Sequence, residues 1–314
     1  MVLFKPKLSI VSTAFNEQLG IEEFIRRVDK TLTDNNLNGE IVMVDDGSKD
    51  KTLAIMESLQ PHIGRLKVIA HRKNRGLTTA IATGIENSSH DYILFLPSDL
   101  ESHPEEDIPK LLAPLNEGYD LTVGWRVNRR QGFLKTQLSE FFNWLSRKMF
   151  QVNVHDLGWV KAFKKEIYYN VEALRADWHR YFVILAAKEG YKIKEVRTKF
   201  YPRRAGRSHF GKIGLKRIPG GVFDLIVIKF LTSFSLKPMR MFGGLGFLML
   251  IFGILFSMYL LYLNLTIGHV YDRVLLIMVI LMLFLASLQL FAIGFLAELI
   301  VSGTERKISR GKSK

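Results

Sequence analysis

The sequence predicts an α/β protein with a doubly wound, mostly parallel sheet, followed by a C-terminal hairpin of two transmembrane helices. Three observations lead to this fold class. Short β-branched and apolar runs alternate with segments of helical apolar spacing through residues 8–96. A cluster of polar residues follows each of the first four expected strands. Two long segments near the C-terminus contain no charged residue.

The first part of the chain is expected to alternate between strands and helices. The strands are β-rich apolar runs, and the helices have apolar residues at three- and four-residue spacing. We expect strands at 8–13, 40–44, 66–70, 92–96 and 120–123, and helices at 21–32, 51–59 and 78–86. Because this order joins parallel strands through crossover helices, ligands are expected beyond the carboxyl ends of the strands.

The composition limits the chemistry that the chain can perform. Its 314 residues are enough for one large domain or two ordinary ones. The absence of cysteine excludes disulfides, thiolate catalysis and Cys-ligated metals. A formal net charge of +14 indicates an anionic partner. We expect lipid rather than nucleic acid, because no basic recognition helix or aromatic stacking platform stands apart from the expected membrane-facing stretches.

The membrane hairpin rests on residues 241–263 and 274–297, which carry no charge and each exceed the roughly 20 residues that cross a bilayer. Two buried core helices are the alternative, which these lengths disfavour. Basic residues flank the outer ends, whereas Asp272 and Arg273 are the charged residues of the connecting loop, 264–273. By the positive-inside rule, both ends and the N-terminal domain face the cytosol.

Four parts of the chain follow from this pattern. They are a cytosolic domain at 1–210, an amphipathic juxtamembrane segment at 211–240, a hairpin at 241–301 with helices 241–263 and 274–299, and a basic cytosolic tail at 302–314. We expect a multi-pass protein of an inner or cytoplasmic membrane, or of a membrane like that of the endoplasmic reticulum.

Residues 133–152 mix aromatic and basic side chains, a pattern typical of a helix that lies at a membrane surface. An ordinary core-facing helix is an equal alternative for this stretch. In the first span, Gly243, Gly244 and Gly246 would allow close contact between helices. A homo-oligomer is therefore a further expectation.

Polar clusters follow the expected strand ends at 13–17, 45–50, 71–76 and 97–101, and three of the four contain carboxylates, whereas 71–76 is basic. At such positions a carboxylate can accept hydrogen bonds from a base or ribose, or hold a divalent cation against a diphosphate. One Asp-Gly-Ser turn would carry little weight by itself. Four clusters at successive strand ends indicate a ligand site.

These clusters resemble glycosyltransferase family 2. The motifs that carry the resemblance are Ser9-Ile10-Val11 with Asn16-Glu17, Val44-Asp45-Asp46-Gly47-Ser48 with Asp50 and Thr52, Asn74-Arg75-Gly76, and Ser98-Asp99-Leu100 with Pro104-Glu105. The chain is similar to the polyprenyl-phosphate branch, which includes dolichol-phosphate mannose synthases and bacterial polyisoprenyl-phosphate hexosyltransferases, and the C-terminal hairpin also suits this branch. The resemblance implies a GT-A fold and inverting transfer of sugar from a UDP- or GDP-sugar to polyprenyl phosphate at the cytosolic membrane face.

The resemblance also implies a nucleotide-sugar site that consists of Ala14, Phe15, Glu17, Asp46, Gly76, Asp99 and Arg203. Arg203 would clamp the donor diphosphate, because a guanidinium binds phosphate oxygens bidentately. Asp99 matches the last acid of the family's Asp-x-Asp, and Glu101 would add a second oxygen ligand for Mg²⁺ or Mn²⁺. Pro97 replaces the first acid, so looser metal binding or lower activity is expected.

Arg126, Lys135 and Ser139 are the residues that the resemblance places at the acceptor phosphate. Lys135 and Ser139 are four residues apart and would share one helix face. Asp156 lies near the position of an acid that some relatives hold close to the reaction centre, so Asp99 and Asp156 are the catalytic candidates. A lipid phosphate is already an anion, so catalysis would depend on positioning and on stabilising the departing diphosphate, and a general base is optional.

Two other functions remain open at this point. A catalytically weak, nucleotide-binding membrane scaffold would account for Pro97. A polysaccharide synthase is disfavoured, because such enzymes usually have more membrane spans and a Gln-x-x-Arg-Trp motif, which this sequence lacks.

Overall fold

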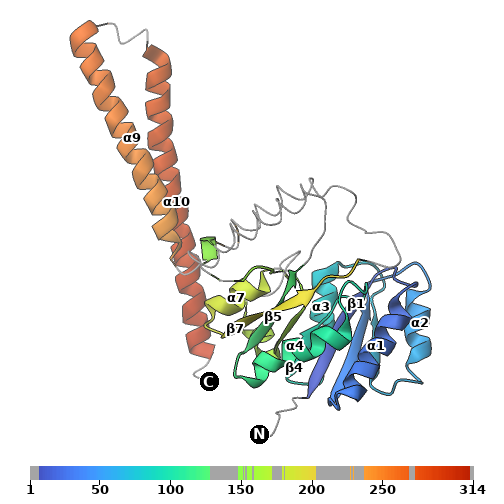
Figure 1. Cartoon of the computed structure of the whole chain (residues 1–314). Coiled ribbons are helices and arrows are strands. Elements are labelled where there is room, and N and C mark those ends of the chain that lie inside the picture. Colours follow the sequence, from blue (N-terminus) through green and yellow to red (C-terminus); the bar gives the residue numbers. More distant parts are fainter. Residues whose placement is uncertain are drawn as a thin grey trace. The chain divides into compact units, whose positions relative to one another are not determined.

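The computed structural model describes residues 7–127, 148–150, 152, 154–157, 159–171, 179, 181–202, 227, 229, 237–268 and 273–311, with side chains as far as residue 303 in the last range. The chain divides into two compact units, Met1–Asp224 and Leu225–Lys314 (Figure 1).

A seven-stranded sheet forms the centre of the first unit, with the strand order β3-β2-β1-β4-β6-β5-β7. The neighbouring pairs β1–β2, β1–β4, β2–β3 and β5–β7 are parallel, and β6 is antiparallel to both β4 and β5. The mostly parallel sheet predicted from the sequence is thus confirmed. Its strands are β1 (Leu8–Ala14), β2 (Gly39–Asp45), β3 (Leu66–Ala70), β4 (Tyr92–Phe95), β5 (Leu121–Val127), β6 (Lys161–Lys164) and β7 (Ile193–Lys199).

Helices cover both faces of the sheet (Figure 1). On one face lie α1 (Ile21–Asp34), α2 (Thr52–Leu59) and α4 (Pro104–Asn116), whose apolar residues form the main core with the strands. On the other face lie α3 (Leu77–Glu86) and α7 (Phe182–Lys188), and the short α6 (Lys165–Asn170) follows β6.

The alternation of side chains along β1 explains how both faces are buried. Ile10 belongs to the core beneath α1, whereas Val11 points to the opposite face, toward α3. There α3 approaches so closely that a Cβ on Gly84 would come within 2.4 Å of the Val11 Cγ1 atom. A glycine is therefore required at this contact, and it allows α3 to pack closely against β1.

Several elements were not predicted from the sequence. Helix α4 begins with Pro104 and three acidic residues, which suit a helix N-terminus, but it also contains Pro109 and Pro114. Internal prolines normally argue against a helix, and they obscured this one. The strands β6 and β7 pair with partners far away in sequence, so no local pattern revealed them.

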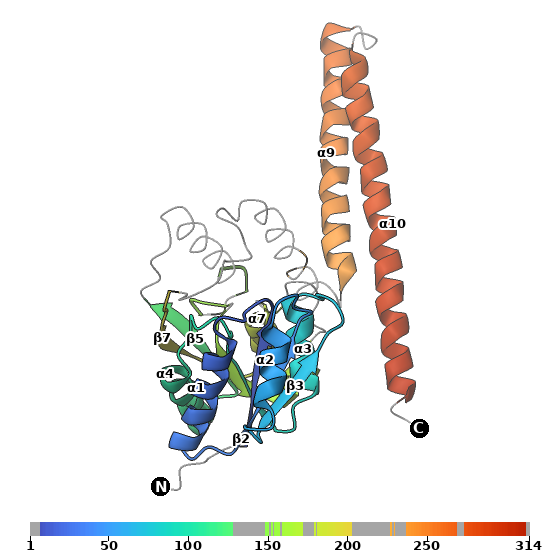
Figure 2. The same ribbon diagram turned by 90° about the vertical axis from the view of Figure 1, so that its right-hand side faces the viewer.

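The second unit contains the two long helices α9 (Pro238–Ile267) and α10 (Val274–Gly311), which pack against each other (Figure 2). By length and composition, both are able to cross a membrane, and they suggest a membrane-anchored protein. Helix α9 ends at Ile267, four residues beyond the predicted end at residue 263.

Small residues bring α9 and α10 together. The Ser287 hydroxyl donates a 2.8 Å hydrogen bond to the Gly246 carbonyl oxygen, and Gly253 faces the Phe284 ring. Of the other predicted contact glycines, Gly243 faces Met239 of its own helix. A Cβ on Gly244 would meet no atom within 4 Å among the described residues. Gly246 therefore serves the hairpin itself, and a homo-oligomer remains a prediction.

Candidate active site

The loops that follow β1 and β2 are joined to each other by hydrogen bonds. The backbone N–H of Asn16 donates to the Ser48 hydroxyl at 2.9 Å, and the Asn16 amide oxygen accepts from the backbone N–H of Lys49 at 2.8 Å. The backbone N–H of Glu17 donates to the Thr52 hydroxyl at 2.8 Å. The loop with the predicted nucleotide contacts Phe15 and Glu17 is thus held against the Asp-Asp-Gly-Ser turn.

Asp46 links the end of β2 to the loop that follows β3. Its two carboxylate oxygens accept hydrogen bonds from the backbone N–H groups of Arg75 and Gly76, both at 2.9 Å. The His71 Nδ1 atom lies 2.8 Å from Asp46 Oδ1, and the backbone N–H of Asp46 donates to the Ala14 carbonyl oxygen. Asp46 therefore orders the start of α3, and three protein groups engage its carboxylate in this structure.

The neighbouring Asp45 belongs to the same motif but was not predicted to be a site residue. Its Oδ2 atom accepts a 3.0 Å hydrogen bond from the backbone N–H of Ser48. Its Oδ1 atom is buried without a hydrogen-bond partner among the described residues. The Asp45 carboxylate is therefore less fully engaged by the described residues than that of Asp46, whose two oxygens both accept hydrogen bonds. The acidic doublet was visible in the sequence, but only the structure separates the roles of its two members.

The predicted metal ligands share one tight turn after β4. The Asp99 Oδ1 atom accepts a hydrogen bond from the backbone N–H of Glu101 at 3.2 Å, and Leu100 between them has a positive φ of 59°. Within the described ranges, no group of three or more His, Asp or Glu side chains is arranged to hold a metal ion. Two carboxylates fit Mg²⁺ or Mn²⁺ chemically, provided that donor phosphates and water complete the oxygen shell.

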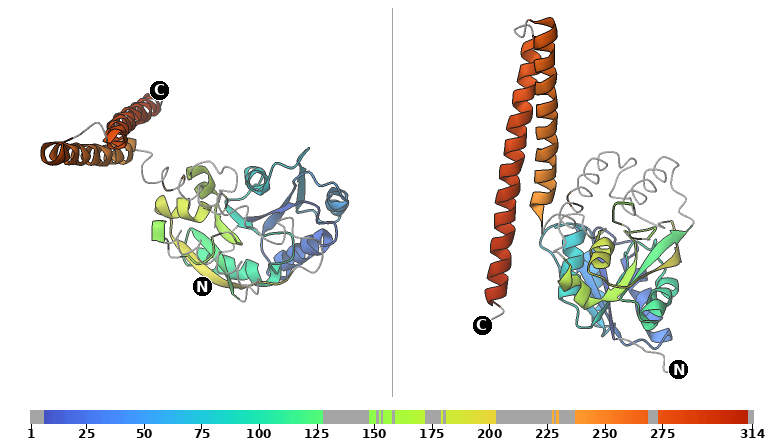
Figure 3. Two further views of the ribbon diagram at one scale, coloured as in Figure 1. Left: turned by 90° about the horizontal axis from the view of Figure 1, so that it is seen from above. Right: turned by 90° about the vertical axis from the view of Figure 1, so that its left-hand side faces the viewer.

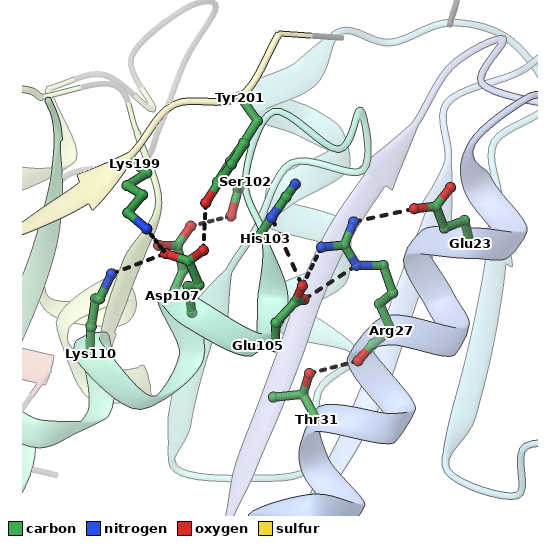
Figure 4. A network of polar contacts seen from close by, with 11 residues as sticks. Glu23, Arg27, Thr31, Ser102, His103, Glu105, Asp107, Lys110, Lys199 and Tyr201 are labelled. Carbon is green, nitrogen blue, oxygen red and sulfur yellow. Dashed lines mark hydrogen bonds and ion pairs between the residues drawn. The ribbon is translucent and has the colours of Figure 1, made fainter. Parts of the chain in front are cut away.

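Tyr201, two residues before Arg203 in the sequence, packs beside Ser102 and His103, which follow this turn (Figure 4). Its backbone N–H donates to the Glu101 carbonyl oxygen at 3.0 Å, and its ring stacks on His103 with centroids 3.4 Å apart. The Tyr201 hydroxyl donates to the Glu106 carboxylate, and this bond raises the tyrosine pKa to about 12. No pattern in the sequence indicated this contact.

Beneath the same turn, the Ser102 hydroxyl donates a 2.6 Å hydrogen bond to Asp107 on α4 (Figure 4). Both side chains are buried. Burial raises the pKa of Asp107 from 3.8 to about 6, because few polar groups replace the water that would solvate its charge. Nearby, Arg27 of α1 forms ion pairs with Glu23 and Glu105 and so joins α1 to the first turn of α4.

Arg126 and Asp156, two predicted site residues 30 positions apart, form a bidentate pair at the end of β5. Arg126 Nε donates to Asp156 Oδ2 at 2.5 Å, and Nη2 donates to Oδ1 at 3.0 Å. The guanidinium carbon lies 4.5 Å from the centre of the Trp159 ring. A planar guanidinium that is held at one edge and one face has a defined direction for its remaining N–H groups.

Other predicted positions lie outside the described residues. These are Arg203, Lys135 and Ser139, together with most of the predicted amphipathic stretches 133–152 and 211–240. The structure does bring the ends of β1, β2 and β4 to one edge of the sheet, since β1 is parallel to both neighbours. The Ser98 hydroxyl strengthens this edge with a 2.8 Å hydrogen bond to the Thr13 carbonyl oxygen. Asp99, Asp46 and Ala14 thus lie in loops or strand ends along that edge.

A model of the family described as glycosyl transferase family 2 matches residues 9–169, which is half of the chain and includes these strand ends. The chain belongs to glycosyl transferase family 2. This family 2 glycosyltransferase is 29% identical over 303 residues to a dodecaprenyl-phosphate galacturonate synthase of Rhizobium johnstonii, with 94% of this chain and 87% of that protein covered. It is 31% identical over 300 residues to an undecaprenyl-phosphate 4-deoxy-4-formamido-L-arabinose transferase of Shewanella sediminis, with 93% and 86% covered.

The glycosyltransferase also resembles a solved structure of glucosyl-3-phosphoglycerate synthase from Mycobacterium tuberculosis, in complex with Mn²⁺, UDP-glucose and phosphoglyceric acid. The TM-score is 0.56 at 18% identity, over 71% of this chain and 79% of that one. At this identity the likeness shows the fold alone, and it confirms the predicted GT-A architecture.

Proposed function

We propose that this family 2 glycosyltransferase transfers a sugar from a UDP- or GDP-sugar to polyprenyl phosphate at the cytosolic face of a membrane. The observation that carries the proposal is similarity over more than nine-tenths of the chain to transferases named for polyprenyl-phosphate acceptors. The bidentate pair of Arg126 and Asp156 supports it, because it offers an oriented guanidinium to an anionic acceptor.

In the proposed reaction, a phosphate oxygen of the lipid attacks the anomeric carbon of the donor sugar. The new carbon–oxygen bond forms as the bond to the nucleoside diphosphate breaks, and the leaving diphosphate retains the electron pair. An in-line displacement of this kind inverts the anomeric centre. Because the attacking phosphate is already an anion, positioning contributes more than proton removal.

On the acceptor side, Arg126 would bind the lipid phosphate, with Lys135 and Ser139 as the further predicted contacts. Asp156 would fix the Arg126 guanidinium through the two hydrogen bonds that join them. A carboxylate that is already paired in this way is better suited to orienting a cation than to acting as a base.

On the donor side, the proposed nucleotide-sugar contacts are Ala14, Phe15, Glu17, Asp45, Asp46, Gly76, Asp99 and Arg203. Asp45 is added because it ends β2 directly before Asp46 and belongs to the same motif. Asp99 and Glu101 would hold Mg²⁺ or Mn²⁺, which would neutralise the departing diphosphate. The backbone hydrogen bond from Tyr201 to Glu101 holds the chain just before Arg203 against the turn that carries Asp99 and Glu101. This supports a site in which these two carboxylates and Arg203 contact the same diphosphate.

For localisation, we propose that α9 and α10 anchor the chain in an inner or cytoplasmic membrane with both helix ends in the cytosol. The excess of lysine and arginine outside the hairpin supports this orientation. A cytosolic domain would meet both the soluble nucleotide-sugar and the phosphate of a lipid at the membrane surface.

The test is sugar transfer from a panel of radiolabelled UDP- and GDP-sugars, with galacturonate among them, to undecaprenyl phosphate. The detergent-purified protein is assayed with Mg²⁺, with Mn²⁺ and with a chelator, beside an Asp99→Ala variant. A lipid-extractable sugar that requires metal and Asp99 supports the proposal. Nucleotide binding without transfer from any donor would favour the scaffold, which Pro97 motivates.

A further inference from the structure

The segment that carries Asp156 has no regular secondary structure of its own, so its backbone must find partners elsewhere. Glu195, on β7, supplies them on one side. Its Oε1 atom accepts the backbone N–H groups of His155 at 2.6 Å and Asp156 at 3.1 Å. Its Oε2 atom lies 2.7 Å from the His155 Nδ1 atom. One carboxylate therefore satisfies two successive amides immediately before the Asp156 side chain.

Lys161, on β6, holds the same segment from its other side. Its ammonium group donates to the carbonyl oxygens of Leu157 at 3.4 Å and His179 at 3.1 Å. The side chain is buried, and burial lowers the lysine pKa to about 8, although the charge of Asp156 opposes this shift. Burying an ammonium group that donates only to two neutral carbonyl oxygens costs free energy. An apolar residue would therefore be preferred at this position if packing were its only role.

The same lysine connects the acceptor side of the proposed site to the donor side. The His179 ring nitrogen Nδ1 lies 2.8 Å from the Thr78 hydroxyl on α3. Helix α3 begins directly after Gly76, whose backbone N–H is held by Asp46. Lys161 thus bridges the loop of Asp156 and the helix that follows the predicted nucleotide contacts.

We propose that Glu195 and Lys161 are positioning residues, which hold the backbone before and after Asp156 so that Asp156 keeps Arg126 directed at the acceptor phosphate. This inference rests on the proposed function, in which Arg126 binds that phosphate. We call the two residues a clamp, because the Glu195 carboxylate accepts the N–H groups of His155 and Asp156 and the Lys161 ammonium donates to the carbonyl oxygen of Leu157. Neither residue touches substrate in this account.

The experiment compares Glu195→Met and Lys161→Met with the exposed controls Glu189→Met and Lys188→Met in the full-length protein. Amide hydrogen exchange of a peptide that spans 154–160 reports the clamp directly. Binding of undecaprenyl phosphate, followed by tryptophan fluorescence, reports its consequence without turnover. We expect exchange and the acceptor Kd each to rise about tenfold in the two test variants, with the nucleotide Kd and both controls unchanged.

A second variant distinguishes positioning from general loss of structure. Because the clamp acts through Asp156, combining Lys161→Met with Asp156→Asn should weaken acceptor binding little more than Asp156→Asn alone. Additive losses, faster exchange with an unchanged acceptor Kd, or parallel losses of acceptor and nucleotide binding would each overturn the inference. If the wild type binds the acceptor but transfers no sugar, the proposed function fails while the clamp is still decided by these measurements.

Discussion

The backbone N–H of Gly76 donates a 2.9 Å hydrogen bond to the carboxylate of Asp46, which joins the end of β2 to the start of α3. Gly76 has φ +89° and ψ 154°, a conformation that residues with a Cβ rarely adopt. The contact therefore depends on both residues at once. Asp46 supplies the acceptor, and the glycine permits the backbone turn that brings the N–H group to it.

Replacing this glycine should cost stability through the backbone alone. A Cβ at Gly76 would meet no described atom within 4 Å, so Gly76→Ala should lower the free energy of unfolding by about 1–3 kcal/mol through strain. We also expect weaker nucleotide binding, measured by calorimetry, because the loop of Arg75 would shift. Gly64→Ala is the matched control, since Gly64 also has open space but no positive φ. Equal effects of both substitutions would contradict this account.

Asp107 should make stability depend on pH in a direction opposite to that of a paired surface carboxylate. Its pKa is raised from 3.8 to about 6, so between these values the folded state keeps a proton that the unfolded chain has lost. The free energy of unfolding therefore falls as pH rises through this window. Asp107→Asn removes the charge and keeps a partner for Ser102, so it should be more stable than the wild type by about 1–3 kcal/mol near pH 7.

The check is denaturant unfolding of both proteins near pH 7 and near pH 4. The advantage of Asp107→Asn should largely disappear near pH 4, because the folded wild-type carboxyl group is then protonated and no charge is buried. A wild type that is more stable near pH 7 would show that the charge assists the bond to Ser102 more than burial penalises it.

The bidentate pair of Arg126 and Asp156 predicts that a substitution of Arg126 that keeps only its positive charge will lower activity. Lysine keeps the positive charge but cannot donate two parallel hydrogen bonds to one carboxylate. We expect Arg126→Lys to lower kcat/KM for the polyprenyl phosphate by about tenfold or more, with little change in the KM for the donor. Arg65→Lys serves as the control and should leave both constants unchanged, because the partly exposed Arg65 contacts Asp29 and Thr33 and no predicted site residue.

Pro97 predicts a gain of metal affinity. Pro97→Asp would introduce the first acid of the family's Asp-x-Asp motif. It would add a third carboxylate near Asp99 and Glu101, the two proposed metal ligands. We expect the Mn²⁺ concentration that gives half-maximal transfer to fall about tenfold, because each added carboxylate strengthens a hard-cation site. The titration is performed with wild type and variant at equal donor concentration. An unchanged midpoint would mean that the donor phosphates and water already complete the metal shell.

In the hairpin, substitutions of Gly246 and Gly244 test the packing of α9 against α10, with Gly244 as the control. A Cβ on Gly246 would lie 3.2 Å from the Ser287 carbonyl oxygen, whereas Gly244 has open space among the described residues. Gly246→Leu should therefore force α9 and α10 apart and lower the melting temperature in detergent, by an amount equivalent to about 1–3 kcal/mol. Gly244→Leu should have little effect. A larger loss at Gly244 would indicate that this face packs against another chain.

The strand order places β1 and β4 side by side in the sheet of the first unit, which Figure 3 shows from two further directions, and this brings the loops after these strands together although about 80 residues separate them. The sequence already indicated this arrangement through β-branched runs, helical spacing and the polar cluster after each strand. These are local patterns, and local patterns determine where strands and helices form. The uncharged lengths of the hairpin helices are local in the same sense.

The three-dimensional contacts decided what local patterns do not contain. Asp45 and Asp46 are adjacent and chemically identical, yet the loop after β3 engages both oxygens of Asp46, whereas one buried oxygen of Asp45 has no donor within the described ranges. Lys161 and Glu195 gain their roles only because β6 and β7 come to lie beside the segment of Asp156. Burial, hydrogen-bond partners and charge pairing depend on neighbours distant in sequence. The sequence alone therefore determined the fold class and the family motifs, whereas the tertiary structure decided which carboxylates are paired with groups of the protein, because that pairing depends on neighbours distant in sequence.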